Sequence, residues 1–598
     1  MARNKFDVDE TLEKDSEFKF AHIKRIFSYT KPYRADMIKT VILMIVSTCL
    51  ALVPPYLLKI AIDESIPAKK IGGVLILSAI LLLTLLLNIV FIRFRIMKMS
   101  VVGQSIIRDL RLHLFNHLQE LPFAYYDSRP HGKILVRVVN YINSLSDMLT
   151  NGFINIITDL FSLLAILAVM LFLNVKLTLV GMAGIPLLLL ATWFIKNKQR
   201  VAWRLNSAKQ SNMNAYIHES ISGMKITQGF VREDYNMNIL TDVCESVKKT
   251  WMQAVSVMFL MWPSAENISV WTMSLLYSFS VYLMTNDPTI TLGAVIAFAG
   301  YVGRFWGPIN TIANTYNSIV VNMSYMERIF ETIDEPVLIK DEPGAQLMPT
   351  IEGNVEFKNV TFSYDPETVI LKNISFSCAK GDTIALVGPT GAGKTTIINL
   401  LSRFYNLDSG AVLIDGVDIK GVTLKSLRQQ MGVMLQDSFI FSGTIMDNIR
   451  YSKLDATDDE VIEAAKAVRA HDFIMETENG YNTEVNERGS RLSLGERQLI
   501  SFARALLANP KILILDEATS SIDTKTELLL QEGLNNLLKG RTSFIIAHRL
   551  STIKNATRIM YIDNGIILEE GTHDELLEKK GAYYELYTAQ YAFLKASA

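Results

Sequence analysis

Six long apolar runs in the first half of the chain place the strongest constraint on its fold. They cover residues 37–58, 71–92, 149–173, 177–195, 255–284 and 292–322. A helix needs about 20 mostly apolar residues to cross the hydrocarbon core of a bilayer. Each run comes close to or exceeds this length, and all of them end before residue 330. We therefore expect a membrane domain of six helices over residues 1–330.

The composition agrees with a membrane protein. The 598 residues are 49% hydrophobic and 20% charged, and the mean hydropathy is +0.23. Typical soluble domains carry about 25% charged residues, so this balance favours membrane segments. The formal net charge of −1 provides no dominant basic field, and we expect no nucleic-acid partner. The three cysteines, Cys49, Cys244 and Cys378, lie far apart, which predicts neither a disulfide framework nor a metal cluster.

The connections between the apolar runs indicate which side of the membrane each of them faces. The first-to-second, third-to-fourth and fifth-to-sixth connections are short, whereas the other two are long. Lys24 and Arg25 precede the first run, and Arg93, Arg95 and Lys98 open the first long connection. Because positively charged loops remain in the cytosol, the N-terminus and the long connections are predicted to be cytosolic.

The long connections have helical patterns rather than loop patterns. Residues 97–118 and 201–222 carry apolar side chains at helical spacing with few helix-breaking residues. We therefore expect the membrane helices to extend well into the cytosol. Four polar residues fall within or near the apolar runs, namely Asp159, Glu266, Asn267 and Arg304. Such groups either line a polar cavity for substrate or bond one helix to another, and the pattern is compatible with both roles.

The character of the chain changes after about residue 330. The stretch Asp334–Pro349 holds three prolines, several acidic residues and no long apolar run, so residues 331–350 are predicted to form a linker. From Ile351 onward, short β-rich runs such as 383–387 and 512–515 alternate with helical patterns. Residues 351–598 are therefore expected to form an α/β domain with a largely parallel sheet.

A glycine-rich motif directly follows the predicted strand at 383–387. It reads Gly388, Pro389, Thr390, Gly391, Ala392, Gly393, Lys394, Thr395 and Thr396. The motif fits G-x-x-x-x-G-K-[ST] between a strand and a helix, which is the setting that a phosphate-binding P-loop requires. In such a loop the backbone N–H groups surround phosphate oxygens, Lys394 reaches the terminal phosphates, and Thr395 can ligate Mg²⁺. ATP and Mg²⁺ are therefore the predicted ligands.

Two acidic residues, Asp516 and Glu517, follow the apolar run at 512–515. A buried parallel strand would present both carboxylates at the sheet edge where the P-loop also lies. Asp516 is suited to hold Mg²⁺ through water, and Glu517 can orient and deprotonate the attacking water. Alone, such a run is equally consistent with an ordinary strand end. Together with the P-loop it predicts an ATPase.

Further segments resemble, in their order along the chain, the motif set of ABC transporter ATPase domains. They are Tyr364 in V-T-F-S-Y, Gln436 in V-M-L-Q-D, residues 492–498 (L-S-L-G-E-R-Q), Asp523 in S-S-I-D, and His548 in A-H-R. With six membrane helices before them, the whole chain resembles one half of a bacterial ABC exporter of the multidrug type. The expected fold is a membrane all-α six-helix domain with long cytosolic helical extensions, fused to an α/β P-loop ATPase domain.

The resemblance also implies roles for individual residues. Tyr364 would stack on adenine, Gln436 would meet Mg²⁺ and the attacking water, and His548 would contact the γ-phosphate. The implied catalytic residues are thus Glu517, His548 and Gln436, and the implied Mg²⁺ ligands are Thr395, Gln436 and Asp516. Residues 125–135 resemble the family's first coupling region, and residues 214–228 resemble the second.

Residues 492–498 depart from the family's L-S-G-G-Q signature. Ser493 and Gly495 are retained, but Leu494 replaces a glycine and Glu496 replaces a glutamine. In the family this segment closes over the γ-phosphate held by the other subunit's P-loop, so Ser493 and Gly495 would contact nucleotide there. A nearby carboxylate repels triphosphate. The ATP site that this segment completes is therefore predicted to be impaired.

Intact catalytic residues beside an altered signature suggest an asymmetric pair. We expect a second, non-identical half-transporter that donates an intact signature to the Glu517 site and lacks a proper catalytic acid of its own. The predicted activity is ATP-driven export of small hydrophobic or amphipathic compounds across the plasma (inner) membrane by alternating access. The alternatives are a homodimeric lipid or peptide exporter, an ATP-gated channel, and an importer ATPase, against which the fused membrane half argues.

Overall fold

The protein, described by a computed structural model, consists of two compact units. The first comprises Met1–Gln119 and His131–Glu335, and the second comprises Glu120–Pro130 and Pro336–Ala598. A short segment from the membrane half of the sequence therefore belongs to the same unit as the ATPase half. The described residues are 25–26, 28–148, 152–286, 290–365, 367–434, 438–486, 489, 491–516, 524–546 and 553–595.

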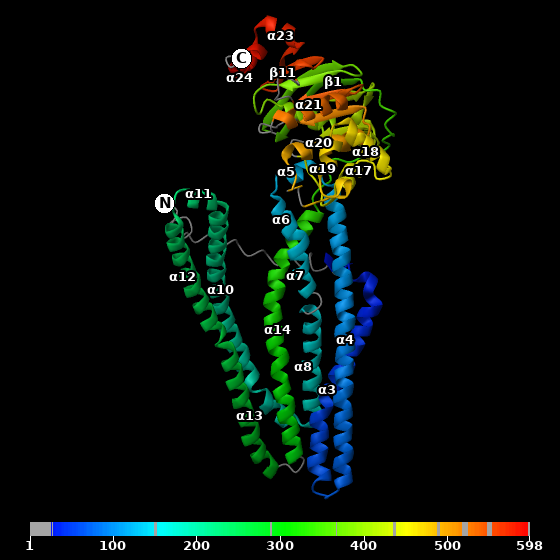
Figure 1. The fold of residues 1–598 in the computed structure, drawn as a ribbon. Helices are drawn as coiled ribbons and strands as arrows, with labels where there is room; N and C mark the ends of the chain where they lie inside the picture. The colour runs from blue at the N-terminus through cyan, green and yellow to red at the C-terminus, as the bar shows by residue number, and fades with distance from the viewer. Residues whose placement is uncertain are drawn as a thin grey trace. The chain divides into compact units, whose positions relative to one another are not determined.

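The first unit consists of long helices together with several short ones (Figure 1). They are α3 (Arg34–Ile60), α4 (Ile71–Glu120), α6 (His131–Val136), α7 (Ile142–Asp147), α8 (Phe153–Leu173), α9 (Val175–Met182), α10 (Gly184–Ser222), α11 (Met224–Gly229), α12 (Glu233–Met258), α13 (Met261–Asn286) and α14 (Leu292–Ile333). Within the described residues, six helical stretches are long and apolar enough to cross a membrane, as the six apolar runs predicted. α4 and α10 continue far beyond their apolar segments, which confirms the predicted helical extensions.

Two of the predicted spans are interrupted by short breaks. The span 177–195 contains Ala183 between α9 and α10, and the span 255–284 contains a turn at residues 259–260 between α12 and α13. Pro186 and Pro263 are each the third residue of the helix that follows the break. The first turn of a helix has no partners for its N–H groups, so a proline is tolerated there. Apolar patterning alone does not reveal such breaks.

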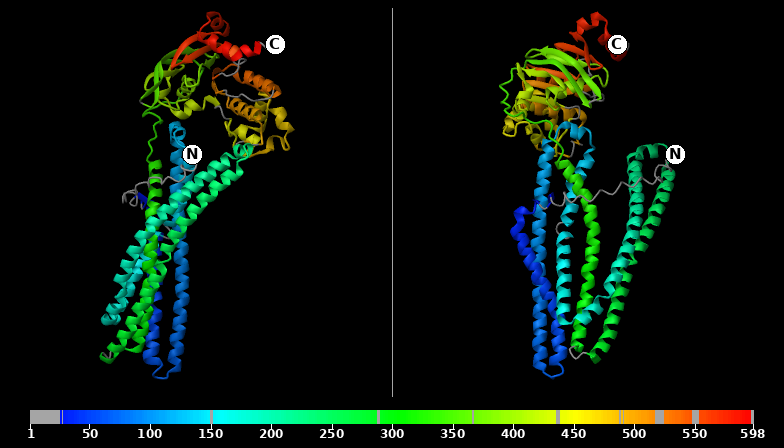
Figure 2. Two further views of the ribbon diagram at one scale, coloured as in Figure 1. Left: turned by 90° about the vertical axis from the view of Figure 1, so that its left-hand side faces the viewer. Right: turned by 180° about the vertical axis from the view of Figure 1, so that it is seen from behind.

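The helices of the first unit pack in two groups, on which Figures 1 and 2 agree. α14 packs against α3 and α8, while α12 lies along α10, and α13 contacts α9, α10 and α14. One buried apolar cluster joins α8, α9, α13 and α14. Its members include Ile166, Met170, Leu177, Leu276, Phe298 and Tyr301.

The second unit is built on a six-stranded sheet in the order β12-β11-β3-β10-β9-β6. The five strands from β11 to β6 run parallel, and β12 is antiparallel at the edge. These strands are β3 (Thr383–Val387), β6 (Met431–Met434), β9 (Ile512–Asp516), β10 (Thr542–Ile546), β11 (Arg558–Asp563) and β12 (Ile566–Gly571). β3 and β9 match the predicted strands at 383–387 and 512–515. All five residues of β10 are buried, as expected for a central parallel strand.

A second, antiparallel sheet has the order β2-β1-β4-β5. Its strands are β1 (Val355–Asp365), β2 (Thr368–Cys378), β4 (Ser409–Ile414) and β5 (Val417–Asp418). The helices of the ATPase half include α15 (Lys394–Leu401), α16 (Leu424–Arg428), α17 (Ile445–Arg450), α18 (Asp458–Ala467), α19 (His471–Glu476), α20 (Leu494–Leu507), α21 (Thr524–Leu538), α23 (His573–Lys579) and α24 (Ala582–Lys595), and β7 (Gly443–Thr444) pairs with β8 (Glu484–Val485).

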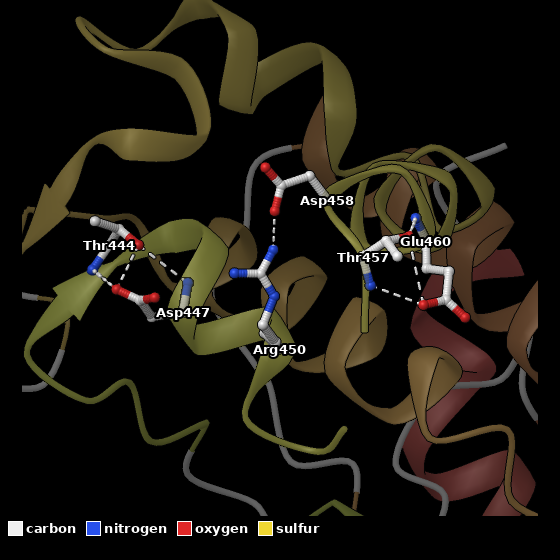
Figure 3. Close-up of polar contacts among 6 residues, drawn as sticks. All are labelled: Thr444, Asp447, Arg450, Thr457, Asp458 and Glu460. Atoms are coloured by element: carbon white, nitrogen blue, oxygen red, sulfur yellow. Dashed lines mark hydrogen bonds and ion pairs between the residues drawn. The ribbon is translucent and has the colours of Figure 1, made fainter. Parts of the chain in front are cut away.

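Capping boxes fix the starts of two adjacent helices, α17 and α18 (Figure 3). Thr444 and Asp447 cap α17, and Thr457 and Glu460 cap α18, with each side chain bonded to the other residue's backbone N–H. Arg450, the last residue of α17, forms an ion pair with Asp458 at the start of α18. These contacts fix where the two short helices begin, and a cap stabilises a helix by about 1 kcal/mol.

Candidate active site

The P-loop connects the end of β3 to the start of α15. Its glycines Gly388, Gly391 and Gly393 have φ angles of +142°, +84° and +105°, which residues with a Cβ rarely adopt. At Gly388 a Cβ would lie 2.0 Å from the carbonyl oxygen of Ile562 on β11. This position therefore requires glycine. The loop leads into the N-terminus of α15, which favours bound anions.

Lys394 is the first residue of α15 and is only 8% exposed. Its Nζ donates hydrogen bonds to the carbonyl oxygens of Gly388 and Pro389, both at 2.8 Å. Burial lowers the pKa of the Lys394 ammonium, and the negative charge of Asp516 acts in the opposite direction. The lysine is thus held inside the loop, where phosphate oxygens can replace its carbonyl partners.

Asp516 is the last residue of β9 and lies at the carboxyl ends of the parallel strands, where the P-loop also begins. In the sheet register it pairs with Ile546 of β10, which in turn pairs with Leu386 of β3. Thr395 is exposed in the first turn of α15. A hydroxyl and a carboxylate are the hard oxygen donors that Mg²⁺ prefers, so Thr395 and Asp516 fit this ion.

Tyr364 lies at the end of β1 beside the P-loop helix. Its hydroxyl is 3.2 Å from that of Thr396 and accepts a hydrogen bond from Asn399 Nδ2 at 3.4 Å. The ring of Tyr405 packs edge-on against it, with centroids 5.0 Å apart. Tyr364 remains 44% exposed, so a large part of it is open to a stacking partner.

The altered signature forms the start of α20. Ser493 is the N-cap residue, and its Oγ accepts a hydrogen bond from the N–H of Glu496 at 3.3 Å. In return, Glu496 Oε2 accepts from the N–H of Ser493 at 2.7 Å. The two residues therefore form a closed capping box. The carboxylate lies at the positive end of the helix dipole, where an incoming phosphate would also bind.

Three predicted catalytic residues, Gln436, Glu517 and His548, lie outside the described residues. In the sequence, Glu517 directly follows Asp516, and His548 is the second residue after β10. Their roles stay predictions.

Comparison with known proteins assigns a family to this combination of membrane helices and a P-loop sheet. Residues 37–309 match the model of the ABC transporter transmembrane region, and residues 371–520 match that of the ABC transporter. The chain is 43% identical to YknV of Bacillus subtilis (strain 168), an uncharacterized ABC transporter ATP-binding protein, over 98% of this chain and 97% of YknV. This chain belongs to the ABC transporter family.

Other relatives extend this assignment to exporters. YgaD of Bacillus subtilis (strain 168), a putative multidrug export ATP-binding/permease protein, is 37% identical over 95% of this chain and 99% of its own. The structure of a bacterial Atm1-family ABC exporter with ATP bound matches with a TM-score of 0.78 and 29% identity, covering 93% of this chain and 98% of that one. The chain is therefore a multi-pass membrane ABC exporter with a cytosolic ATPase domain that uses ATP for transport.

In this ABC transporter the segment Glu120–Pro130 packs within the ATPase unit. Its central helix is α5 (Phe123–Asp127). The Phe123 ring lies 4.6 Å from that of Phe404 between centroids, and Tyr405 donates a hydrogen bond to Asp127 Oδ2 at 2.7 Å. The Arg428 guanidinium lies 5.0 Å from the centroid of the Phe404 ring, on which α5 also packs.

The sequence indicates a coupling region around Tyr125, but it does not indicate which residues of the ATPase unit this region contacts. Phe404 and Tyr405 follow the P-loop helix in a short R-F-Y run, and two adjacent aromatic residues at a helix end were an available signal. The bond between Ser493 and Glu496 was also missed, although S-L-G-E fits the capping-box pattern S-x-x-E.

Proposed function

We propose that this chain is one subunit of a heterodimeric exporter of hydrophobic or amphipathic compounds, with one hydrolytic ATP site and one degenerate site. The carboxylate of Glu496, held at the N-terminus of α20 by its hydrogen bond to Ser493, carries the proposal. The hydrolytic site uses the P-loop of this chain and the signature of the partner. The degenerate site combines the signature of this chain with the P-loop of the partner.

Both altered positions weaken the degenerate site. Glu496 places a negative charge at the start of α20, where the N–H of Ser493 donates a hydrogen bond to its Oε2. Carboxylate and triphosphate repel each other strongly in a partly dry interface. Leu494 adds a side chain at a position where the family has glycine, which hinders close approach of backbone to phosphate. ATP binding there is therefore weak.

At the hydrolytic site, the residues of this chain have separate roles. Lys394 and the P-loop glycines hold the phosphates, and Thr395, Gln436 and Asp516 would hold Mg²⁺. When bound, Mg²⁺ neutralises charge that develops on the phosphates. Glu517 orients and deprotonates the attacking water, His548 contacts the γ-phosphate, and the exposed ring of Tyr364 stacks on adenine.

Restoring the signature tests this asymmetry. The double variant Leu494→Gly/Glu496→Gln is expected to bind ATP about tenfold more tightly at the degenerate site, because a repulsive charge and the side chain of Leu494 are removed. The measurement is the number and affinity of ATP sites on the assembled transporter. Glu478→Gln, which removes an exposed carboxylate outside α20, is the matched control. Equal ATP affinity of the double variant and the unmodified protein would contradict the proposed cause.

Contacts within the ATPase unit support a route from nucleotide to the membrane helices. Tyr364 packs edge-on against Tyr405, which donates a hydrogen bond to Asp127 of α5. α5 lies in sequence between α4 and α6, so a shift of Tyr364 upon nucleotide binding reaches both helices. Burial and the bond to Asp127 raise the pKa of the Tyr405 hydroxyl, so Tyr405 stays a neutral donor at physiological pH.

Removing the hydroxyl of Tyr405 should therefore partly uncouple ATP hydrolysis from substrate transport. Tyr405→Phe keeps the ring but loses the bond to Asp127, and we expect substrate stimulation of ATP hydrolysis to fall about threefold while ATP affinity is unchanged. The ratio of stimulated to basal hydrolysis measures this effect. Tyr561→Phe removes a hydroxyl from β11 as the control. If substrate stimulation is unaltered in Tyr405→Phe, this contact does not transmit the signal.

The tip that joins α10 to α12 is the proposed contact with the partner subunit. It contains α11, and its apolar side chains are largely exposed in the single chain: Ile221, Ile226, Phe230 and Val231 are 66%, 68%, 75% and 80% exposed. Such a group of exposed apolar residues marks a protein interface. The resemblance of residues 214–228 to a coupling region supports docking on the ATPase domain of the other subunit.

A further inference from the structure

A polar cavity of about 230 Å³ lies among the membrane helices of the first unit. It is lined by residues of α3, α4, α8 and α14, which neighbour one another in Figures 1 and 2. Eight of the twelve lining residues are polar, among them Ser47, Thr48, Asn88, Arg95, Asp159 and Arg304. Ionisable groups are costly within a membrane and usually mark functional sites, so this cavity needs a ligand or another function to explain its lining.

The cavity lies toward the cytosolic end of the membrane-spanning segments. Asp159 is fourteen residues before Leu173, the end of α8, which corresponds to about 21 Å of helix. Asn88 is seventeen residues after Ile71, the start of α4, which corresponds to about 26 Å. Both helix ends lie at predicted external connections. In a hydrocarbon core about 30 Å thick, the cavity therefore occupies the half nearer to the cytosol.

A proline in α3 helps to hold one arginine at the wall. Pro55 has no N–H, so the carbonyl of Ala51, four residues earlier, has no helical partner. Arg304 of α14 donates a hydrogen bond from Nη1 to this carbonyl. Tyr301, one turn earlier in α14, donates to the neighbouring carbonyl of Leu52 at 2.8 Å. These bonds join α14 to α3 and place the guanidinium of Arg304 beside the cavity.

The cavity presents both signs of charge together with unused acceptors. Arg95 and Arg304 supply two positive charges, and Asp159 supplies a negative charge that interacts with that of Arg95. Among the described residues, Asn88 Oδ1 and Asp159 Oδ2 are buried without a hydrogen-bond partner. Buried acceptors need donors. A ligand that matches this lining therefore has a hydrogen-bond donor beside Asn88 and Asp159 and an acidic group beside the arginines.

We infer that this cavity binds the zwitterionic head group of an amphipathic substrate, an ammonium together with a phosphate or carboxylate. A purely anionic head group would leave both acceptors unpaired and would face Asp159. A purely cationic head group would face two arginines. An ammonium can donate to Asn88 and Asp159 while the acid group binds the guanidiniums, which suit planar oxyanions. This inference rests on the proposed export of amphipathic compounds and narrows its substrate class.

Two kinds of molecule carry this head group, and the probes separate them. Lauroyl lysophosphatidylethanolamine combines an ammonium with a phosphate, and Nα-lauroyl-lysine combines an ammonium with a carboxylate. Lauroyl lysophosphatidylglycerol is the anionic probe, and dodecylamine is the cationic probe. All four have a twelve-carbon chain, so differences in binding report the head group.

The test measures equilibrium binding of these probes to the full-length chain in phosphatidylcholine nanodiscs without nucleotide. We expect at least one zwitterionic probe to bind about tenfold more tightly than the anionic and cationic probes. Asp159→Asn should remove the tighter binding of the zwitterionic probe relative to the anionic probe. Arg95→Gln should remove the tighter binding of the zwitterionic probe relative to dodecylamine. Arg93→Gln and Glu266→Gln, exposed residues that do not line the cavity, should preserve the wild-type order.

The outcomes separate this inference from the proposed function. The same order of affinities in the unmodified protein, Asp159→Asn and Arg95→Gln would overturn the inference, as would the absence of a preference for zwitterionic probes. Binding is read without ATP, so it does not depend on turnover. Head-group selectivity without ATP-driven movement in the assembled transporter would instead retain the cavity and reject the proposed export.

Discussion

Glu517→Gln should lower ATP turnover by the assembled transporter about a hundredfold or more while ATP binding is retained, because a general base contributes roughly 10²–10⁴ to the rate. Glutamine keeps the shape of glutamate and one acceptor oxygen, but it cannot accept the proton of the attacking water. Steady-state hydrolysis and binding of a fluorescent ATP analogue provide the two readouts.

The control for Glu517→Gln is Glu463→Gln, which neutralises an exposed residue of α18 and should turn over ATP at the wild-type rate. Turnover above about half of the wild-type rate in Glu517→Gln would assign hydrolysis to another base. It would also mean that the site completed by the altered signature is active.

Gly388→Ala is expected to abolish ATP binding. A Cβ at this position would lie 2.0 Å from the carbonyl oxygen of Ile562. Gly388 directly follows β3, and Ile562 belongs to the neighbouring strand β11, so the two positions cannot move apart without opening the sheet. We expect at least a hundredfold loss of ATP affinity and a lower unfolding temperature of the ATPase unit, both measurable by titration and calorimetry.

Gly391→Ala provides the matched comparison for Gly388→Ala. Gly391 also has a positive φ, +84°, but a Cβ there would meet no atom within 4 Å. Only the backbone strain of about 1–2 kcal/mol remains, which corresponds to roughly a tenfold loss of affinity. Equal effects of the two substitutions would contradict the contact with Ile562 as the cause.

The sequence was sufficient to predict the architecture because its signals are local. Six apolar runs and the helical pattern of residues 97–118 reflect periodicity within single elements, and the structure has the corresponding helices. The P-loop motif was equally clear, since glycine positions and Lys394 serve one backbone geometry. The breaks at Ala183 and at residues 259–260 leave no mark in the apolar content, although a proline that can kink a helix follows each of them, Pro186 and Pro263.

Features that depend on distant contacts were harder to predict. The bond from Tyr405 to Asp127 joins residues 278 positions apart, and no local pattern specifies it. The sequence predicts the membrane cavity only in part. Asp159 and Arg304 stand out as polar groups in apolar runs, whereas the place of Asn88 and Arg95 in the cavity follows only from the packing of α4 beside α8. The capping box of Ser493 is local and could have been predicted from its spacing.

The asymmetry of the proposed pair is tested by measuring ATP hydrolysis by this chain purified alone in lipid nanodiscs and by the same chain assembled with candidate non-identical half-transporters. We predict turnover that appears only with a partner and is lost in Glu517→Gln. A stable dimer of this chain alone that hydrolyses ATP at two equal sites would contradict the asymmetry, and would make Leu494 and Glu496 tolerated variations of the signature.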